Sequence, residues 1–126
     1  MIELEPIGTV HTPIETTEDA PRQGMLDDIE GTIELEAAYA AGLDGYEPGE
    51  EILVVWFADR ADRSLLRVDK RGNRGVFRSR SPARPNPIVL TTVEIVAIEG
   101  PRLTVRGVDM LDGSPVLDLK VPLGPA

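Results

Sequence analysis

Several short apolar or β-branched segments, separated by turn signals, constrain the fold of this chain most strongly. The longest, residues 88–98 (IVLTTVEIVAI), ends at Gly100-Pro101, which predicts a strand followed by a tight turn. Residues 52–57 (ILVVWF) form a continuous apolar run, which predicts a buried central strand. Residues 31–36 (GTIELE) alternate between apolar and polar side chains, as expected for a strand with one buried face.

The same reasoning predicts further strands at residues 7–12, 102–109 and 116–121. Gly8 is expected at a bulge. Residues 36–43 favour one short helix of about two turns, and the polar residues 13–29 predict a long ordered or mobile loop. Strands at such short spacing predict a mainly β domain, either a small closed or partly closed barrel or a sandwich.

The length and composition bound the class of protein. The 126 residues predict one domain, residues 1–126, that can bury about two thirds of its unfolded surface. The absence of cysteine excludes disulfides, thiolate zinc sites and thiol nucleophiles, and is typical of a reducing compartment. No apolar run approaches the roughly 18 residues of a membrane span, and MIELEPIGTV lacks the basic start of a signal peptide. We therefore expect a cytoplasmic protein without a membrane span.

The formal net charge of -9 is distributed very unevenly along the chain. Residues 60–84 contain nine basic residues and only Asp62 and Asp69 as acids, a net charge of +7, whereas the rest of the chain carries −16. This asymmetry favours a cationic site on an anionic body. The alternative is a solvated face on which basic residues happen to cluster.

The end of this basic segment, residues 78–87 (RSRSPARPNP), combines charge with stiffness. Each proline fixes φ and favours an extended residue before it, so the loop loses little entropy on ordering. Such a loop can aim Arg80 and Arg84 at carboxylates or phosphates. From the residues alone, a proline-rich turn between two strands is an equal alternative.

Residues 109–120 (DMLDGSPVLDLK) place three carboxylates around an Asp112-Gly113 turn. The residues alone predict a hairpin turn, and the alternative is that Asp109, Asp112 and Asp118 face a cation. The only histidine, His11, stands in a predicted strand and cannot form a zinc site by itself. The sequence contains neither a P-loop nor a dinucleotide-binding glycine motif. We expect no bound metal.

Three segments in this order resemble the motifs of the TrmO family, also called TsaA or YaeB. Residues 75–87 (GVFRSRSPARPNP) resemble its G-V-F-A-T-R-S-P-x-R-P-N-P-I-G-L-S signature, and residues 108–120 (VDMLDGSPVLDLK) resemble its D-x-x-D-G-T-P-V-L-D-I-K. Residues 19–24 (DAPRQG) resemble its P-R-Q. The resemblance covers nearly the whole chain. It implies a small β-barrel homodimer that methylates N6 of threonylcarbamoyladenosine, just 3′ of the anticodon of tRNA, with S-adenosylmethionine as methyl donor.

Carried over residue by residue, the resemblance implies a set of side chains that bind S-adenosylmethionine. They are Pro21, Arg22, Gln23, Asp59, Arg60, Arg80, Leu90, Asp109, Asp112, Gly113 and Ser114. The carboxylate that accepts the proton of adenine N6 has three unranked candidates, Asp59, Asp109 and Asp112. The RNA phosphates are expected to contact Arg74, Arg78 and Arg84.

The chain departs from the family pattern at several positions. Asp59 and Arg60 lie near a position at which the family usually has histidine. Other departures are Arg78 and Ser79 in place of Ala-Thr, Val89 and Thr91 in place of the Gly and Ser of P-I-G-L-S, and Lys120-Val121-Pro122 in place of Lys-Pro-Tyr. Two alternatives therefore stay open: a noncatalytic RNA-binding barrel, and a methyltransferase of the same fold with a different small acceptor.

Overall fold

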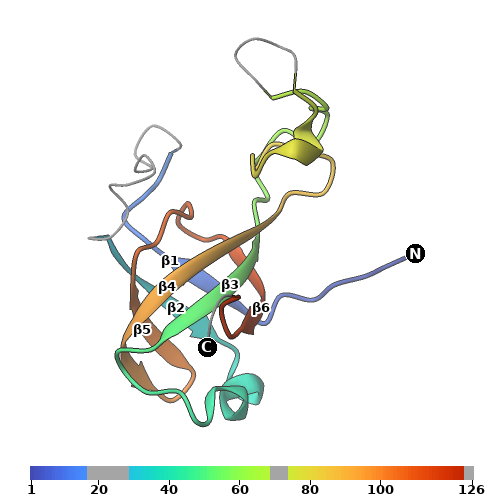
Figure 1. Ribbon diagram of the computed structural model, residues 1–126. Helices are drawn as coiled ribbons and strands as arrows, with labels where there is room; N and C mark the ends of the chain where they lie inside the picture. Colours follow the sequence, from blue (N-terminus) through green and yellow to red (C-terminus); the bar gives the residue numbers. More distant parts are fainter. Residues whose placement is uncertain (17–28, 69–73, 124–126) are drawn as a thin grey trace.

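The computed structural model describes residues 1–16, 29–68 and 74–123, and within them six strands close into one barrel (Figure 1). The strands are β1 (Gly8–His11), β2 (Glu30–Leu35), β3 (Glu51–Phe57), β4 (Ile88–Glu99), β5 (Arg102–Arg106) and β6 (Pro115–Lys120). Their order around the barrel is β1-β2-β5-β4-β3-β6, and each neighbouring pair is antiparallel. The predicted mainly β fold is confirmed, and the barrel is the architecture that forms.

Apolar side chains from all six strands fill the interior of the barrel. Val10, Ile33, Ile52, Ile95 and Leu103 are each completely buried. Burying one such side chain contributes about 1.5–3 kcal/mol, so this interior supplies most of the favourable free energy of folding. β3 is buried without interruption over residues 52–56, as its continuous apolar run predicts.

The predicted helix is present as a 3-10 helix, η1 (Ala37–Leu43), between β2 and β3. Leu43 is its only buried residue, and it packs on the barrel core. A 3-10 turn suits so short a segment, which the Asp44-Gly45 turn ends. The sequence did not predict a second 3-10 helix, η2 (Val76–Arg78). Among the described residues, no helix is long and apolar enough to span a membrane.

The bulge predicted at Gly8 is wrong, because the register of β1 with β2 is continuous from that residue onward. A Cβ at Gly8 would overlap the carbonyl oxygen of Glu34. Glycine therefore serves here to let two strand backbones approach closely. The register shifts of the barrel lie between Val55 and Trp56 opposite β6, and between Ile95 and Ala97 opposite β5.

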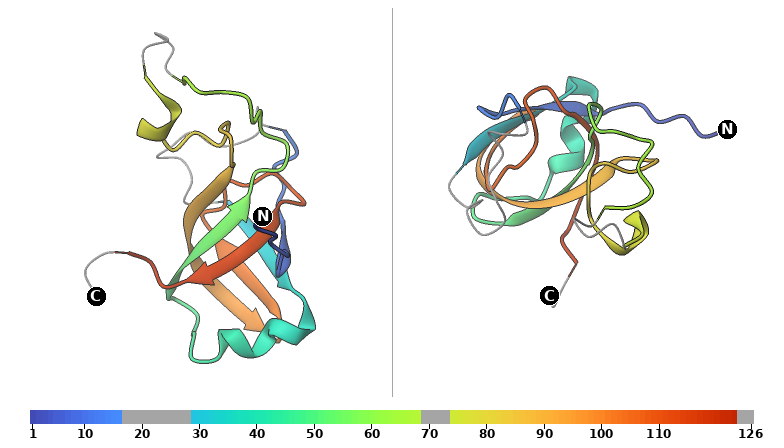
Figure 2. Two further views of the ribbon diagram at one scale, coloured as in Figure 1. Left: turned by 90° about the vertical axis from the view of Figure 1, so that its right-hand side faces the viewer. Right: turned by 90° about the horizontal axis from the view of Figure 1, so that it is seen from above.

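The antiparallel order sends alternate connections to opposite ends of the barrel, which forms a closed ring in the right-hand view of Figure 2. One end, which we call the mouth, carries the described parts of three connections: residues 12–16 and 29 between β1 and β2, residues 58–68 and 74–87 between β3 and β4, and residues 107–114 between β5 and β6. The opposite end carries η1 and the turn at Gly100-Pro101 (Figure 1). Of the long loop predicted at residues 13–29, only 13–16 and 29 fall within the described part of the chain.

Candidate active site

The mouth gathers segments from all three sequence motifs or their immediate neighbours. The Asp112 turn lies in the 107–114 connection, and the proline-rich loop lies in the 58–87 connection, which rises above the barrel in Figure 1. Residues 12–16 leave β1 at the same end. The predicted cofactor residues Pro21, Arg22 and Gln23 lie outside the described residues.

The Asp112 turn is docked against the segment that follows β1. The backbone N–H of Asp112 donates to the carbonyl oxygen of Ile14 over 2.7 Å, and that of Gly113 donates to Val10 over 2.8 Å. The backbone N–H of Thr12 donates to Oδ1 of Asp112 over 3.0 Å. Gly113 has φ of +86°, a conformation that favours glycine. The predicted turn is therefore an ordered corner, fixed by both backbone and carboxylate.

Arg60 links the 58–87 connection to the same corner. Its Nη2 donates to the carbonyl oxygen of Asp112 over 2.8 Å, and its Nε lies 3.6 Å from Oδ1 of Asp59. Both side chains of this ion pair are nearly half exposed, so solvent screens it and its contribution to stability is small. The main effect of Arg60 is to position the start of the connection over the Asp112 turn.

A pocket of about 140 Å³ opens between these segments. Its walls combine apolar side chains with two carboxylates, a guanidinium and a hydroxyl. The lining residues are Trp56, Ala58, Asp59, Arg60, Ala61, Pro82, Asp109, Leu111 and Ser114. Four residues that the resemblance assigned to the cofactor, Asp59, Arg60, Asp109 and Ser114, thus come together from two connections that are distant in the sequence.

Five lining residues were missed at the sequence level. Trp56 had a usable signal, since positions 52, 54 and 56 of a strand share one face and its side chain is therefore directed inward. Pro82 belongs to the proline-rich loop. The loop therefore contacts the pocket with a proline ring and not with the guanidinium group of one of its arginines. Ala58, Ala61 and Leu111 carry no chemical signature that distinguishes them from ordinary loop residues.

Asp109 differs from the other two candidate carboxylates in its surroundings. It is partly buried, whereas Asp59 and Asp112 are exposed. Burial raises the pKa of Asp109 above its ordinary value, and hydrogen bonds from Thr91 and from its own backbone N–H act in the opposite direction. Of the three, Asp109 is the carboxylate whose environment best suits proton exchange.

Ser114 stabilises the Asp112 turn through hydrogen bonds to the backbone. It is almost completely buried, and its hydroxyl donates to the carbonyl oxygen of Leu111 over 2.6 Å. Its backbone N–H donates to the same oxygen over 3.1 Å. The hydroxyl is therefore engaged in holding the turn, and Ser114 contributes a fixed wall to the pocket.

The proline-rich loop is stiffened by its own arginine. Nη1 of Arg84 donates to the carbonyl oxygens of Ser79 and Ser81 over 3.0 and 3.1 Å. From outside the loop, Nε of Arg63 donates to the carbonyl oxygen of Pro85 over 2.8 Å. The Arg84 side chain thus turns back onto its own loop, and its predicted contact with RNA stays a prediction.

Three other arginines of the basic segment are presented to solvent. Arg74, Arg78 and Arg80 are exposed, and their side chains form no hydrogen bond or ion pair with other residues that the structure describes. Their guanidinium groups are accordingly available to an anionic partner. Arg80 is not among the residues that line the pocket, so its predicted contact with the cofactor stays a prediction.

Leu90 lies on the outer face of β4. It is 47% exposed, whereas the next residue, Thr91, is buried in the barrel. Leu90 does not line the pocket of its own chain. Its predicted contact with the cofactor also stays a prediction.

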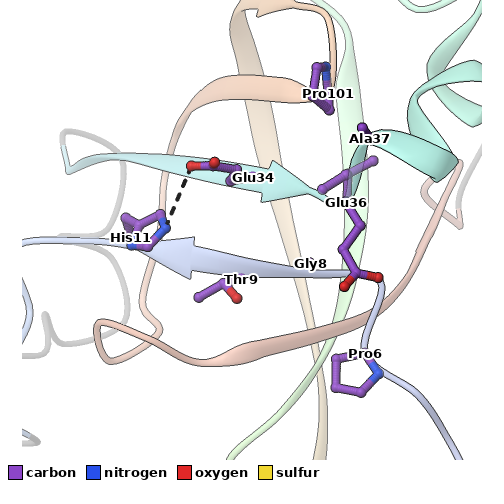
Figure 3. Close-up of a pocket in the computed structure, with 9 residues that line it drawn as sticks. Pro6, Gly8, Thr9, His11, Glu34, Glu36, Ala37 and Pro101 are labelled. Carbon is purple, nitrogen blue, oxygen red and sulfur yellow. Dashed lines mark ion pairs between the residues drawn. The ribbon is translucent and has the colours of Figure 1, made fainter.

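A wider, shallower groove lies around His11 on the side of the barrel (Figure 3). It has a volume of about 580 Å³ and is lined by Pro6, Gly8, Thr9, His11, Glu34, Leu35, Glu36, Ala37 and Pro101. Nε2 of His11 lies 3.9 Å from Oε1 of Glu34, and Nδ1 lies 3.8 Å from Oδ1 of Asp112. His11 thus sits between β2 and the Asp112 turn. Within the described ranges, no three His, Asp or Glu side chains are grouped so as to hold a metal ion.

Comparisons with known proteins point to one family. The family model described as the tRNA-methyltransferase O N-terminal domain matches residues 9–123. A probable S-adenosyl-L-methionine-binding protein of Halobacterium salinarum is 48% identical over 120 residues, which cover 94% of this chain and 96% of that protein. An S-adenosyl-L-methionine-binding protein of Archaeoglobus fulgidus is 49% identical over 120 residues, covering 93% and 86% respectively.

Solved structures show the same fold. The crystal structure of TrmO from Pseudomonas aeruginosa matches with a TM-score of 0.81 at 31% sequence identity, over 98% of this chain. This chain spans only 56% of the chain in that crystal structure, whereas it spans nearly all of the Halobacterium protein.

Proposed function

Because the chain belongs to the family of the tRNA-methyltransferase O N-terminal domain, we propose that it is an S-adenosylmethionine-dependent methyltransferase with its cofactor at the mouth. The proposed acceptor is N6 of threonylcarbamoyladenosine in the anticodon loop of tRNA. The observation that carries the proposal is the pocket at the mouth, which is lined by four of the residues that the family resemblance assigns to the cofactor. When bound, the cofactor supplies a methyl group on a positively charged sulfur.

The chemistry of the pocket fits the reactive part of such a cofactor. The carboxylates of Asp59 and Asp109 suit a cationic sulfur, and the apolar faces of Trp56 and Leu111 suit a methyl group or an aromatic ring. At about 140 Å³, the pocket is smaller than the roughly 300 Å³ at which small-molecule sites begin. The proposal therefore takes the remaining contacts from residues 21–23 and, in a homodimer, from a second copy of the chain.

Asp109 is the proposed general base. Methyl transfer by in-line displacement depends chiefly on holding the donor and the acceptor in line. The exocyclic amine of adenine is a weak nucleophile and must lose a proton, so a carboxylate beside it assists the reaction. Asp109 lines the pocket and burial raises its pKa, whereas Asp59 is exposed and Asp112 is not among the residues that line the pocket.

The exposed arginines of the basic segment are the proposed RNA contacts. Arg74, Arg78 and Arg80 belong to the connection that rises above the mouth, and the rest of the chain carries −16. RNA phosphates are attracted to the first region and repelled by the second, which restricts docking to the mouth. Bases of a single-stranded anticodon loop are accessible to such a site. A tRNA substrate also supports a cytoplasmic location.

A homodimer is proposed on the outer face of the barrel. Ile88 and Leu90 on β4 are 43% and 47% exposed. Beside them lies an apolar groove of about 430 Å³, lined by Ile2, Leu4, Pro6, Phe57, Arg63, Asn86, Ile88, Pro115 and Leu117. Contiguous exposed apolar surface of this kind is typical of protein–protein contacts. Because the family resemblance implies a homodimer, the proposed partner is a second copy of this chain.

The test is radiolabelled methyl transfer to tRNA with and without the threonylcarbamoyl group. We expect label only in the modified tRNA, and a large loss of transfer with Asp109→Asn and with Arg80→Ala. Calorimetry with S-adenosylmethionine measures cofactor binding without an acceptor. A folded protein that does not bind this cofactor overturns the proposal. Cofactor binding without transfer to any tRNA supports the noncatalytic RNA-binding barrel, and transfer only to small molecules supports a different acceptor.

A further inference from the structure

A chain of three buried or partly buried polar groups runs from the barrel wall into the pocket. Nε1 of Trp56 on β3 lies 3.0 Å from Oγ1 of Thr91 on β4. The same hydroxyl lies 2.9 Å from Oδ1 of Asp109, in the connection after β5. Trp56 and Thr91 are 5% and 8% exposed, so water does not compete with these hydrogen bonds.

The hydrogen atoms of this chain can be assigned from the chemistry of the groups. An indole nitrogen can only donate, so Trp56 donates to Oγ1 of Thr91. The hydroxyl has a single hydrogen, and Asp109 is the acceptor that its geometry provides. A proton on Oδ1 would make the Thr91 hydroxyl accept twice and would leave the hydroxyl hydrogen without this acceptor, so Oδ1 is favoured as an acceptor. Oδ2 is therefore the favoured oxygen for exchanging a proton.

We infer that Thr91, oriented by Trp56, is a positioning residue that fixes Oδ1 of Asp109 as an acceptor and makes Oδ2 its proton-exchanging oxygen. The inference rests on the proposed function for its role in transfer. In that role, Oδ2 takes the N6 proton while the nitrogen–carbon bond forms, and the electrons of the broken carbon–sulfur bond go to sulfur. The other charged groups that line the pocket are Asp59 and Arg60, which largely offset each other because they form an ion pair.

A merely structural hydrogen bond would tie the connection to the barrel, and its loss would leave the pH profile of methyl transfer unmoved. The positioning role instead requires that loss of the Thr91 hydroxyl raise the pKa of Asp109, because the hydroxyl stabilises the charged form. A hydrogen bond to a charged group corresponds to a shift of about one pH unit. The pKa of Asp109 and the pH profile of methyl transfer, measured together, therefore separate the two roles.

The experiment is a carbon-13 NMR titration of the aspartate carboxyl groups, in which the Asp109 signal is identified by its absence from Asp109→Asn. We expect Thr91→Val, which keeps the side-chain shape, to raise the pKa of Asp109 by about one unit. Thr91→Ser, which keeps the hydroxyl, should restore the wild-type titration. The matched control is Thr92→Val, because Thr92 is exposed on the opposite face of β4. Trp56→Phe is the second variant, and it should shift the pKa in the same direction by less than Thr91→Val.

The same shift is expected in the acidic limb of the pH profile of methyl transfer. A titration of Thr91→Val that superimposes on that of the wild type overturns the inference, as does a shifted titration with an unmoved pH profile. If the wild type does not bind S-adenosylmethionine, the proposed function fails, and the NMR titration still decides whether Thr91 controls the proton affinity of Asp109.

Discussion

Arg60 donates a hydrogen bond from Nη2 to the carbonyl oxygen of Asp112 across 2.8 Å, although the two residues belong to different connections at the mouth. The backbone N–H of Thr12 reaches Oδ1 of the same aspartate from the segment after β1. All three connections of the mouth therefore meet at one residue. Movement of the Asp112 turn is expected to change the shape of the pocket, because Arg60 lines it directly.

Arg60→Met should weaken cofactor binding more than it weakens the fold. The substitution keeps much of the side-chain length and removes the donor to Asp112. Because Arg60 also lines the pocket, S-adenosylmethionine affinity by calorimetry is expected to fall about fivefold, which corresponds to about 1 kcal/mol of binding free energy. The matched control is Arg102→Met, which removes an exposed pair with Glu34 on the barrel surface. Equal affinities of the two variants would contradict the prediction.

Asp109→Asn should stabilise the protein at neutral pH. Because burial raises the folded-state pKa of Asp109, the folded protein binds more protons than the unfolded chain between the ordinary and the raised value. Stability therefore falls as pH rises through this window, and the loss persists above it. We expect the variant to gain about 0.5–2 kcal/mol in free energy of unfolding at pH 7, and to lose this advantage near pH 4. Urea denaturation at both pH values measures this.

The control for this stability change is Glu99→Gln, at an exposed position on β4. It should change the free energy of unfolding by less than about 0.5 kcal/mol at either pH. A destabilised Asp109→Asn at pH 7 would show that the carboxylate is not penalised by burial.

Arg78→Ala and Arg80→Ala should each weaken tRNA binding and its dependence on salt. Both side chains are exposed, and each contact with a phosphate releases condensed counterions. We expect the slope of log affinity against log salt concentration to fall by about one for each arginine. Fluorescence anisotropy between 50 and 200 mM salt measures this slope. Arg102→Ala, on the barrel surface away from the mouth, is the control, and an equal effect there would exclude a localised RNA site.

Gly8→Ala should destabilise the barrel, because a Cβ there overlaps the carbonyl oxygen of Glu34. Overpacking of this kind costs about 1–3 kcal/mol, which chemical denaturation resolves. Gly42→Ala is the matched control, since a Cβ at Gly42 meets nothing within 4 Å. Substitution there should be neutral or stabilise by up to about 1 kcal/mol. If Gly8→Ala leaves the free energy of unfolding unchanged, β1 and β2 can move apart enough to accommodate the Cβ, and the prediction is wrong.

Leu90→Glu should produce a monomer if the outer face of β4 is the dimer interface. A carboxylate buried between two copies would lack a partner, which strongly disfavours association. The control is Tyr39→Glu, which places the same charge at an exposed apolar position on η1, away from the outer face of β4, and should leave the dimer intact. Light scattering coupled to size-exclusion chromatography measures the mass of both variants. A dimer that survives Leu90→Glu would require a different interface.

Most of the fold could be predicted because each strand has a local signal. The continuous apolar composition of residues 52–57 predicts a buried strand. The alternation of apolar and polar side chains in residues 31–36 predicts a half-buried strand. Closure of the barrel has no such signal, because it depends on the pairing of β1 with β6, and these strands lie at opposite ends of the sequence. Gly8 shows the same limit: its position in a strand is visible, but the approach of Glu34 is not.

The candidate site was predictable only where family motifs marked it. Asp109 and Ser114 lie in such a motif and line the pocket, whereas Asp59 and Arg60, which also line it, were carried over by position alone. The hydrogen bond between Trp56 and Thr91 joins residues 35 positions apart, so only the register of β3 with β4 reveals it. Spacing also does not show which arginines turn inward, and Arg84 is engaged by its own loop while Arg80 faces solvent.

In the closed barrel, the end of β6, after which the chain leaves the sheet, lies far from the mouth, where the proposed ligands would bind. β6 begins at the mouth and ends at Lys120 near the opposite end (Figure 2). An affinity tag, a fluorophore or a sensor surface attached after residue 123 would consequently be joined to the molecule on the side away from the mouth. Tethered measurements of RNA capture can thus be made with the arginine-bearing side facing the flowing solution.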